Sequence, residues 1–185
     1  RHFFHLFLKN MQDNDSGKQI MKILFISLGC DKNLVDTESM LGYLSRKGYE
    51  ITDDEAEAEA VVVNTCCFIH DAKQESVDEI LAMADLKKEG RIKALIVTGC
   101  LAQRYQDEIR EEIPEVDVIM GTQAIEDIVV ALEGVLAGDA HDYLPDINKP
   151  LPKLNKRMIT TGGHYAYLKI AEGCSNHCTY CAIPK

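Results

Sequence analysis

The sequence is short of basic residues. Twenty lysines and arginines stand against thirty aspartates and glutamates, which gives a formal net charge of -10 and a pI near 5.0. Phosphate backbones and anionic lipids attract the opposite sign of charge, so we do not expect this segment to clamp nucleic acid or bind a lipid surface. The apolar burst at residues 3–8 is too short to span a membrane, and no small-residue cleavage site follows it.

The chain also lacks the even number of cysteines that a disulfide framework needs. It has seven, spread unevenly along 185 residues without a secretory signal. Metal or redox chemistry in the reducing cytoplasm is therefore the better prediction. With 46% hydrophobic and 27% charged residues, the composition is that of a soluble globular protein, which excludes disorder, collagen and a disulfide-stapled miniprotein.

The pattern of apolar residues divides the chain into four parts. We interpret residues 1–20 as a disordered leader or an artefact, with Met21 as the natural start. Residues 21–138 alternate short apolar runs with amphipathic helical stretches, which predicts an α/β domain with a doubly wound, flavodoxin-like or Rossmann-like parallel sheet of five strands. Residues 139–163 are rich in proline and basic residues and read as a linker. Residues 164–185 would open a second, truncated domain.

The expected strands are Lys22–Leu28, Tyr49–Thr52, Val61–Asn64, Ile92–Thr98 and Val116–Met120, with Tyr165–Ile170 as the first strand of the second domain. The helix after the first strand is expected to have Asn33 as its N-cap and to close at Gly48. Apolar spacing predicts further helices around residues 77–84, 101–113 and 125–136.

Three cysteines directly follow expected strands. Cys30, Cys66 and Cys100 come after the first, third and fourth strands, whose carboxyl ends are neighbours in the order 2-1-3-4-5. Three thiolates without a fourth ligand favour an iron–sulfur cluster with one open iron over a closed zinc site. The alternative is that they are small buried hydrophobic residues. Cys67 adjoins Cys66 and points elsewhere, so we assign it to packing.

A second cysteine group has the spacing C-x3-C-x2-C at Cys174, Cys178 and Cys181. Three ligands within eight residues can hold three irons of one cubane cluster and leave the fourth open. The alternative is a zinc knuckle with His177 as fourth ligand, but His177 abuts Cys178 and cannot easily turn to the same ion. We regard His177, His70 and His164 as ordinary polar residues.

Four stretches of the sequence together resemble the radical S-adenosylmethionine methylthiotransferase family. They read SLGCDKNLVDTE (27–38), NTC (64–66), GCLAQ (99–103) and GCSNHCTYCAIP (173–184). The wording after Cys30 looks like the RimO branch, which modifies a ribosomal protein, more than like the tRNA-modifying branch. The family has an N-terminal methylthiotransferase domain, a radical β/α barrel and a C-terminal substrate-gripping domain. Only the first would be complete here, so the chain by itself is expected to be inactive.

The resemblance implies cofactors and residue roles. Cys30, Cys66 and Cys100 would hold an auxiliary 4Fe–4S cluster that carries the sulfur to be donated. Cys174, Cys178 and Cys181 would hold a second 4Fe–4S cluster that binds S-adenosyl-L-methionine, with Tyr180 near its adenine. The implied product is a methylthio group on the β-carbon of an aspartate in small-subunit ribosomal protein S-twelve. A low-potential electron donor would be the second partner, and the acidic surface suits a basic ribosomal protein.

Other functions compete with this hypothesis. One is a tRNA adenosine methylthiotransferase, and another is a non-enzymatic iron–sulfur electron carrier or redox sensor. A cobalamin-dependent radical enzyme would need a D-x-H-x-x-G loop after the first strand, and the sequence has none.

Overall fold

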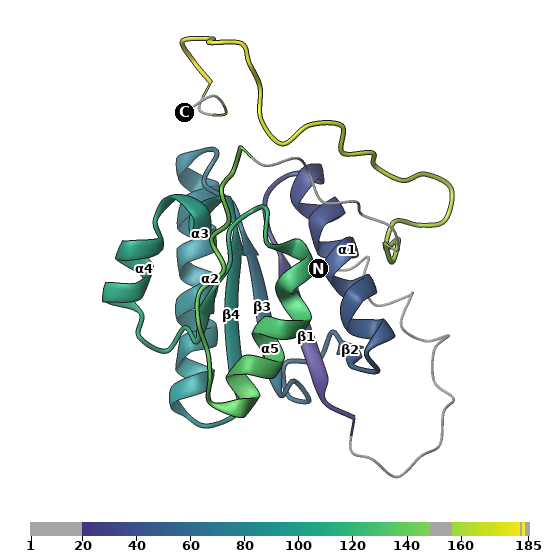
Figure 1. Cartoon of the computed structure of the whole chain (residues 1–185), viewed down its shortest axis with the longest axis vertical. Helices are drawn as coiled ribbons and strands as arrows, with labels where there is room; N and C mark the ends of the chain where they lie inside the picture. The colour runs from purple at the N-terminus through teal and green to yellow at the C-terminus, as the bar shows by residue number, and fades with distance from the viewer. Residues whose placement is uncertain (1–19, 149–156, 182, 184–185) are drawn as a thin grey trace.

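The central feature is a five-stranded parallel sheet in the order β2-β1-β3-β4-β5 (Figure 1). The computed structural model describes residues 20–148, 157–181 and 183. The strands are β1 (Lys22–Ser27), β2 (Glu50–Thr52), β3 (Ala60–Thr65), β4 (Ala94–Gly99) and β5 (Val118–Ile119). The predicted fold class and strand order are confirmed.

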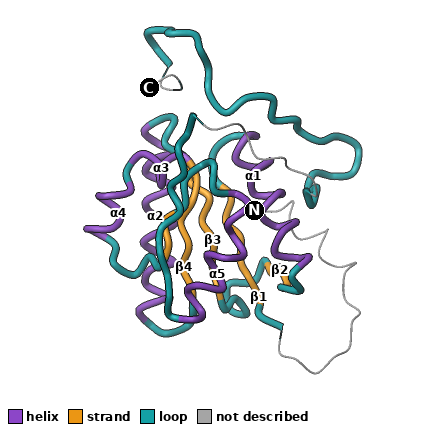
Figure 2. Tube along the Cα trace, viewed as in Figure 1, coloured by secondary structure: helices purple, strands orange, loops and turns teal. Residues whose placement is uncertain are grey.

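Helices cover both faces of this sheet (Figure 2). They are α1 (Asp31–Arg46), α2 (His70–Lys88), α3 (Cys100–Arg104), α4 (Gln106–Glu112) and α5 (Ile128–Ala137), with a short 3-10 turn, η2 (Ile125–Asp127), before α5. Buried side chains of α1 and α5 pack on one face, and those of α2, α3 and α4 pack on the other.

The central strands are buried on both sides because both faces carry helices. All six residues of β3 and all six of β4 are buried. Successive side chains of a strand point to opposite faces, so Val62 joins the core under α1 while Val61 and Val63 join the core under α2. Each fully buried Val contributes roughly 1.5–3 kcal/mol, and this packing fixes the strand ends that carry the cysteines.

Two helix predictions need correction. Helix α1 begins two residues before Asn33 and has Cys30 at its N-cap, so Asn33 lies inside the helix rather than capping it. The helix expected over residues 101–113 is two helices, because the backbone leaves helical geometry at Tyr105, where φ is -123° and ψ is 36°. The predicted end of α1 is right, since Gly48 follows the last turn with φ +90° and donates its N–H to the Ser45 carbonyl.

The strand predicted at residues 165–170 is not formed. This stretch is irregular, and Leu168 and Ile170 are 82% and 84% exposed. A strand needs a partner for its backbone groups, and none of the described strands runs beside it. The predicted leader falls almost wholly, and the predicted linker partly, outside the described residues. No helix in the described parts of the chain is long and apolar enough to cross a membrane.

Candidate functional site

The loops that carry Cys30, Cys66 and Cys100 lie at one edge of the sheet. Cys30 caps α1 just beyond β1, Cys66 directly follows β3, and Cys100 is the first residue of α3 after β4. Strands β1, β3 and β4 are consecutive neighbours in the parallel sheet, so their carboxyl ends share an edge (Figure 1). The thiols range from exposed at Cys30 to buried at Cys66, with Cys100 between them.

Two glycines allow these loops to approach one another closely. Gly29 has φ +88°, and a Cβ placed there would stand 2.5 Å from the Cβ and 2.7 Å from the Sγ of Cys66. Gly99 has φ +95° and lies against the backbone of Thr65 and the side chain of Asn64. Only glycine fits both the positive φ and the missing space at these positions. The loop of Cys30 therefore packs directly on Cys66.

Asn33 links all three cysteine loops through one buried side chain. Its Nδ2 donates hydrogen bonds of 2.9 Å to the carbonyls of Leu28 and Thr65, the residues that precede Gly29 and Cys66. Its Oδ1 accepts a hydrogen bond from the Cys100 thiol, with an Sγ to Oδ1 distance of 3.8 Å. Asn64 completes the link by donating from its Nδ2 to the Asn33 carbonyl. The site is therefore held by an amide as well as by the sheet.

Sequence reasoning missed this role of Asn33 because asparagine shortly after a strand is typical of a helix N-cap. The signal that could have found it is its position three residues after a cysteine, in a helix whose following residues are largely buried. Asparagine is unfavourable inside a helix unless its side chain bonds elsewhere. Ser76 of α2 was missed too, and its Oγ accepts the N–H of Cys66 at 2.9 Å.

The surroundings of Cys100 disfavour its thiolate form. Burial, together with the nearby thiols of Cys67, Cys66 and Cys30, raises the pKa of the Cys100 thiol to about 12. The carboxylate of Glu172 acts in the same direction. A bound metal ion would add positive charge at such a site and would favour deprotonation of a coordinating thiol.

Cys67 differs from its neighbour Cys66. It is half-buried against the core under α2, and burial raises the pKa of its thiol. The guanidinium of Arg104 opposes that shift by its charge and by a hydrogen bond, and Lys73 adds a smaller opposing effect. Its surroundings are therefore the hydrophobic core and two basic side chains, which agrees with the packing role expected for it.

The donors that the edge offers are three cysteine thiols. Among the described residues, no three side chains of His, Cys, Asp or Glu converge closely enough to enclose one metal ion. A structural zinc ion requires four ligands at about 2.0–2.3 Å. A 4Fe–4S cluster is larger and takes its thiolates from more widely spaced positions. Cys30, Cys66 and Cys100 supply three thiols from three neighbouring loops, and thiolates are the usual protein ligands of such a cluster.

The second cysteine group lies in a surface loop. Cys174 and Cys178 are exposed, Cys181 is partly exposed, and Tyr180 is 90% exposed. One backbone hydrogen bond, from the N–H of Cys181 to the carbonyl of Cys178, turns the loop between these two cysteines. The assignment of these residues to a second cluster and to its cofactor stays a prediction.

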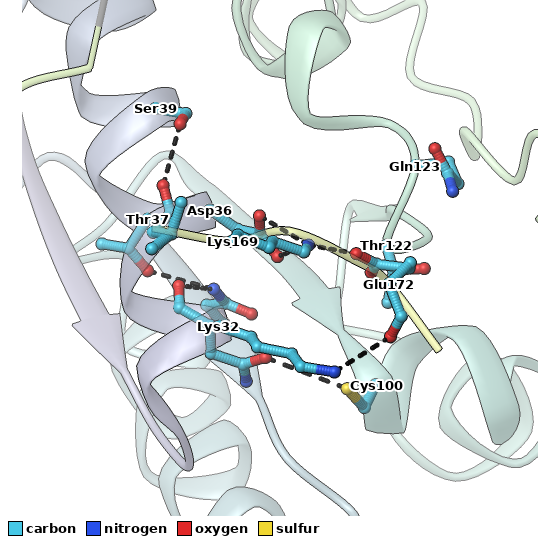
Figure 3. A network of polar contacts seen from close by, with 12 residues as sticks. Lys32, Asp36, Thr37, Ser39, Cys100, Thr122, Gln123, Lys169 and Glu172 are labelled. Atoms are coloured by element: carbon cyan, nitrogen blue, oxygen red, sulfur yellow. Dashed lines mark hydrogen bonds and ion pairs between the residues drawn. The ribbon is translucent and has the colours of Figure 1, made fainter. Parts of the chain in front are cut away.

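The residues just before this loop reach the first cysteine edge. Lys32, two residues after Cys30, donates to the backbone carbonyl of Glu172 at 3.3 Å, and Lys169 pairs with the Glu172 carboxylate. Figure 3 shows Lys32 and Lys169 both extending toward Glu172, with Cys100 beside the end of Lys32. The segment just before the second cysteine group therefore reaches the edge that carries Cys30 and Cys100.

The sequence of the chain is similar to those of known proteins. A profile of the family described as "Uncharacterized protein family UPF0004" matches residues 22–121, which span β1 to β5 and include Cys30, Cys66 and Cys100. The chain belongs to the UPF0004 family. Its UPF0004 region contains the whole parallel sheet, and the second cysteine group follows that region.

Three longer proteins that are similar to this chain carry the same name. "Ribosomal protein uS12 methylthiotransferase RimO" from Lachnoclostridium phytofermentans is 57% identical over 165 residues, which cover 89% of this chain and 38% of the relative. Proteins of the same name from Trichlorobacter lovleyi and Clostridioides difficile are 53% and 52% identical, over 88% and 90% of this chain. The chain spans between 36% and 38% of the length of these three relatives and matches their N-terminal part. The resemblance to the RimO branch is thereby confirmed.

Proposed function

We propose that this chain acts within a cytoplasmic RimO-type enzyme that adds a methylthio group to the β-carbon of an aspartate of ribosomal protein uS12. The enzyme would use two 4Fe–4S clusters and S-adenosyl-L-methionine, with a low-potential electron donor as its second partner. The names of the similar proteins support the ribosomal substrate, and the motif at residues 173–184 supports the radical chemistry. The acidic surface suits a basic protein substrate.

One observation carries the proposal. The loops of Cys30, Cys66 and Cys100 meet at the carboxyl edge of three neighbouring strands, and the Asn33 side chain bonds to all three. Three residues separated by more than thirty positions each have no reason to converge in this way for packing alone, since Cys30 is exposed. Convergent thiols at the ligand-binding edge of such a sheet favour a cofactor site.

In this function some residues of the edge would bind the cluster, and others would hold the loops in place. Cys30, Cys66 and Cys100 would bind three irons of the auxiliary cluster, whose open iron would carry the sulfur atom to be transferred. Gly29 and Gly99 keep the loops close, and Asn33 and Ser76 hold the backbone around Cys66 in place. The side chain of Lys32 ties this edge to the segment before the second cysteine group.

Cys174, Cys178 and Cys181 would hold the second cluster, which binds S-adenosyl-L-methionine. Tyr180 would lie near the adenine of that cofactor, and its 90% exposed ring is free of the sheet region. The segment just before the second cysteine group reaches the edge of Cys30 and Cys100, which would help to bring a methylated sulfur and a substrate radical within reach of one another.

The test is an anaerobic assay of the full-length protein that contains this chain. The protein is mixed with S-adenosyl-L-methionine, a chemical reductant and either ribosomal protein uS12 or unmodified tRNA, and the products are read by mass spectrometry. We expect a methylthiolated aspartate in uS12, no modified adenosine, and loss of the product after Cys30→Ala. A methylthiolated adenosine would replace the proposal with the tRNA-modifying function. Redox cycling without cleavage of S-adenosyl-L-methionine would replace it with an electron carrier.

A further inference from the structure

Two acidic residues of α1 have buried carboxylate side chains. Asp36 and Glu38 have side chains that are only 9% and 1% exposed. The residue between them, Thr37, faces the sheet, where its Oγ1 donates to Ser27 and accepts from the side chain of Asn64. The ion pairs that the structure gives Asp36 and Glu38 are all made with residues 157–172, which we call the docked segment.

Glu38 holds the beginning of the docked segment. Its Oε2 lies 2.7 Å from the Nε of Arg157, and its Oε1 accepts the backbone N–H and the hydroxyl of Thr160 at 2.6 and 2.9 Å. Its backbone carbonyl accepts the N–H of Met158 at 2.8 Å. One residue of α1 thus makes four polar contacts with three residues of the segment.

Asp36 holds the end of the docked segment. The Nζ of Lys169 lies 2.8 and 2.7 Å from the two carboxylate oxygens of Asp36, and the side chain of Lys169 is 2% exposed. The same Nζ pairs with Glu172, and Lys32 donates to the Glu172 carbonyl (Figure 3). Residues 169–172 are therefore fixed on the first two turns of α1.

Asp36 and Glu38 contact the docked segment from different sides of α1. Residues two apart on an α-helix do not face each other, because each residue turns the helix by about 100°. The docked segment therefore crosses over α1 between its contact with Glu38 and its contact with Asp36. Figure 1 shows this part of the chain passing over the end of the molecule where α1 begins.

Burial and charge act against each other in the pair of Asp36 and Lys169. Burial lowers the pKa of Lys169, but the charges and hydrogen bonds of Asp36 and Glu172 raise it above its ordinary value. Burial raises the pKa of Asp36 to about 6 although the charge of Lys169 lowers it. The remaining charged neighbours, Glu172 and Lys32, act in opposite directions on that carboxyl. A buried pair of this kind is unfavourable to break, because removal of one partner leaves the other charge buried and uncompensated.

We infer that Asp36 and Glu38 are positioning residues that dock residues 157–172 across α1 and so fix the loop of Cys174, Cys178 and Cys181 relative to the edge that carries Cys30. Cys30 caps the same helix, and Cys174 comes two residues after Glu172. Helix α1 is thus the common support of both cysteine groups. The meaning of this for sulfur transfer rests on the proposed function, whereas the docking itself does not.

Hydrogen exchange of the 185-residue chain, read by mass spectrometry, tests the docking without any cofactor. Asp36→Asn and Glu38→Gln keep the size of each side chain and remove its charge. We expect peptides that cover residues 157–172 to exchange roughly tenfold faster in both variants, while peptides of β3 and β4 keep their protection. Glu126→Gln is the matched control, because Glu126 accepts a hydrogen bond from Tyr43 at an exposed position away from the docked segment.

A double-mutant cycle separates positioning by the ion pair from a general loss of structure. Lys169→Met alone leaves Asp36 without its partner, so we expect the same rise in exchange. The combination of Asp36→Asn with Lys169→Met removes both charges and should restore much of the protection. The inference would be overturned if the single variants left the exchange rate of residues 157–172 unchanged. It would also be overturned if the effects of the two substitutions on that rate simply added in the double variant.

The same cycle in the full-length protein keeps this inference distinct from the proposed function. If the variants change hydrogen exchange of residues 157–172 but the protein forms no methylthiolated uS12, the docking inference stands and the proposed function is wrong. If methylthiolated uS12 forms but the variants leave hydrogen exchange unchanged, the proposed function stands and the docking inference is wrong.

Discussion

The sheet region (residues 22–137) and the C-terminal segment (residues 157–181) position their cysteines by different means. The sheet region has two hydrophobic cores and places Cys66 and Cys100 directly after buried strands. The C-terminal segment forms no helix or strand among its described residues and leaves Cys174 and Cys178 exposed. It is held to α1 by ion pairs at Glu38 and Asp36.

The comparison shows that the packed sheet fixes the positions of the first three cysteines, whereas ion pairs only hold the segment that leads to the second cysteine group. Backbone hydrogen bonds and packing set the first three thiols, so they should keep their arrangement without the rest of the protein. Ion pairs and a few hydrogen bonds hold the segment before the second cysteine group. The arrangement of its three thiols therefore depends on contacts with other parts of the full-length protein or with a cofactor. Variants in the two regions should therefore differ in both the size and the kind of their effects.

The largest effect is expected for Gly99→Ala in the sheet region. A methyl group there would meet the backbone of Thr65, and φ at this position is +95°. We expect a loss of about 3 kcal/mol or more in the free energy of unfolding, measured with urea. Gly90→Ala is the control, because Gly90 has φ +72° with nothing within 4 Å, so only the backbone penalty of about 1–2 kcal/mol applies. Equal losses would contradict the close contact.

A smaller loss is expected for Asn33→Ala. The substitution leaves the buried carbonyls of Leu28 and Thr65 without their donor and should lower the free energy of unfolding by about 2–3 kcal/mol. It should also release the loops of the three cysteines, so less iron should be retained after anaerobic reconstitution. Asn148→Ala, at an exposed position, should change neither quantity. Full iron loading in Asn33→Ala would show that the sheet alone sets the site.

Ser76→Ala, also in the sheet region, should cause a smaller loss of stability than Asn33→Ala. It removes the acceptor for the N–H of Cys66, and the loss should be about 1–2 kcal/mol. Ser39→Ala is the matched control, since within the described parts of the chain the buried hydroxyl of Ser39 donates to the carbonyl four residues earlier in its own helix. A loss at Ser39 as large as that at Ser76 would argue against a special role for the Cys66 backbone contact.

The smallest effect on stability is expected for Tyr180→Ala in the C-terminal segment. Tyr180 is 90% exposed, so the free energy of unfolding of this chain, measured by thermal denaturation, should change by less than about 0.5 kcal/mol. In the full-length protein the same change should weaken binding of S-adenosyl-L-methionine, measured by calorimetry. A marked loss of stability would mean that Tyr180 packs on the sheet region after all.

The sequence was informative where periodicity and strand ends decide the structure. The run of apolar residues in β3 and β4 predicted buried strands, and the positions of Cys30, Cys66 and Cys100 predicted a shared edge. Long-range contacts were not predictable in this way. The carboxylates of Asp36 and Glu38 meet partners more than a hundred residues away, and nothing in their spacing indicates which basic residues will reach them.

The errors have a common physical cause. Tyr165–Ile170 has the apolar content of a strand, but a strand forms only where a neighbour accepts its hydrogen bonds. The spacing of Leu101, Tyr105, Ile109 and Ile113 is helical, yet the backbone turns at Tyr105 between two short helices. Asn33 was assigned to a local cap, whereas its side chain serves the tertiary contacts of three loops.

The central claim is that Cys30, Cys66 and Cys100 together hold one 4Fe–4S cluster. The most direct measurement is iron and sulfide content after anaerobic reconstitution of the 185-residue chain that carries Cys174→Ala, Cys178→Ala and Cys181→Ala. We predict about four irons and four sulfides per chain, unchanged by Cys67→Ala and lost with Cys30→Ala, Cys66→Ala or Cys100→Ala. Failure to bind iron, or iron that persists without any one of these three thiols, would contradict the claim.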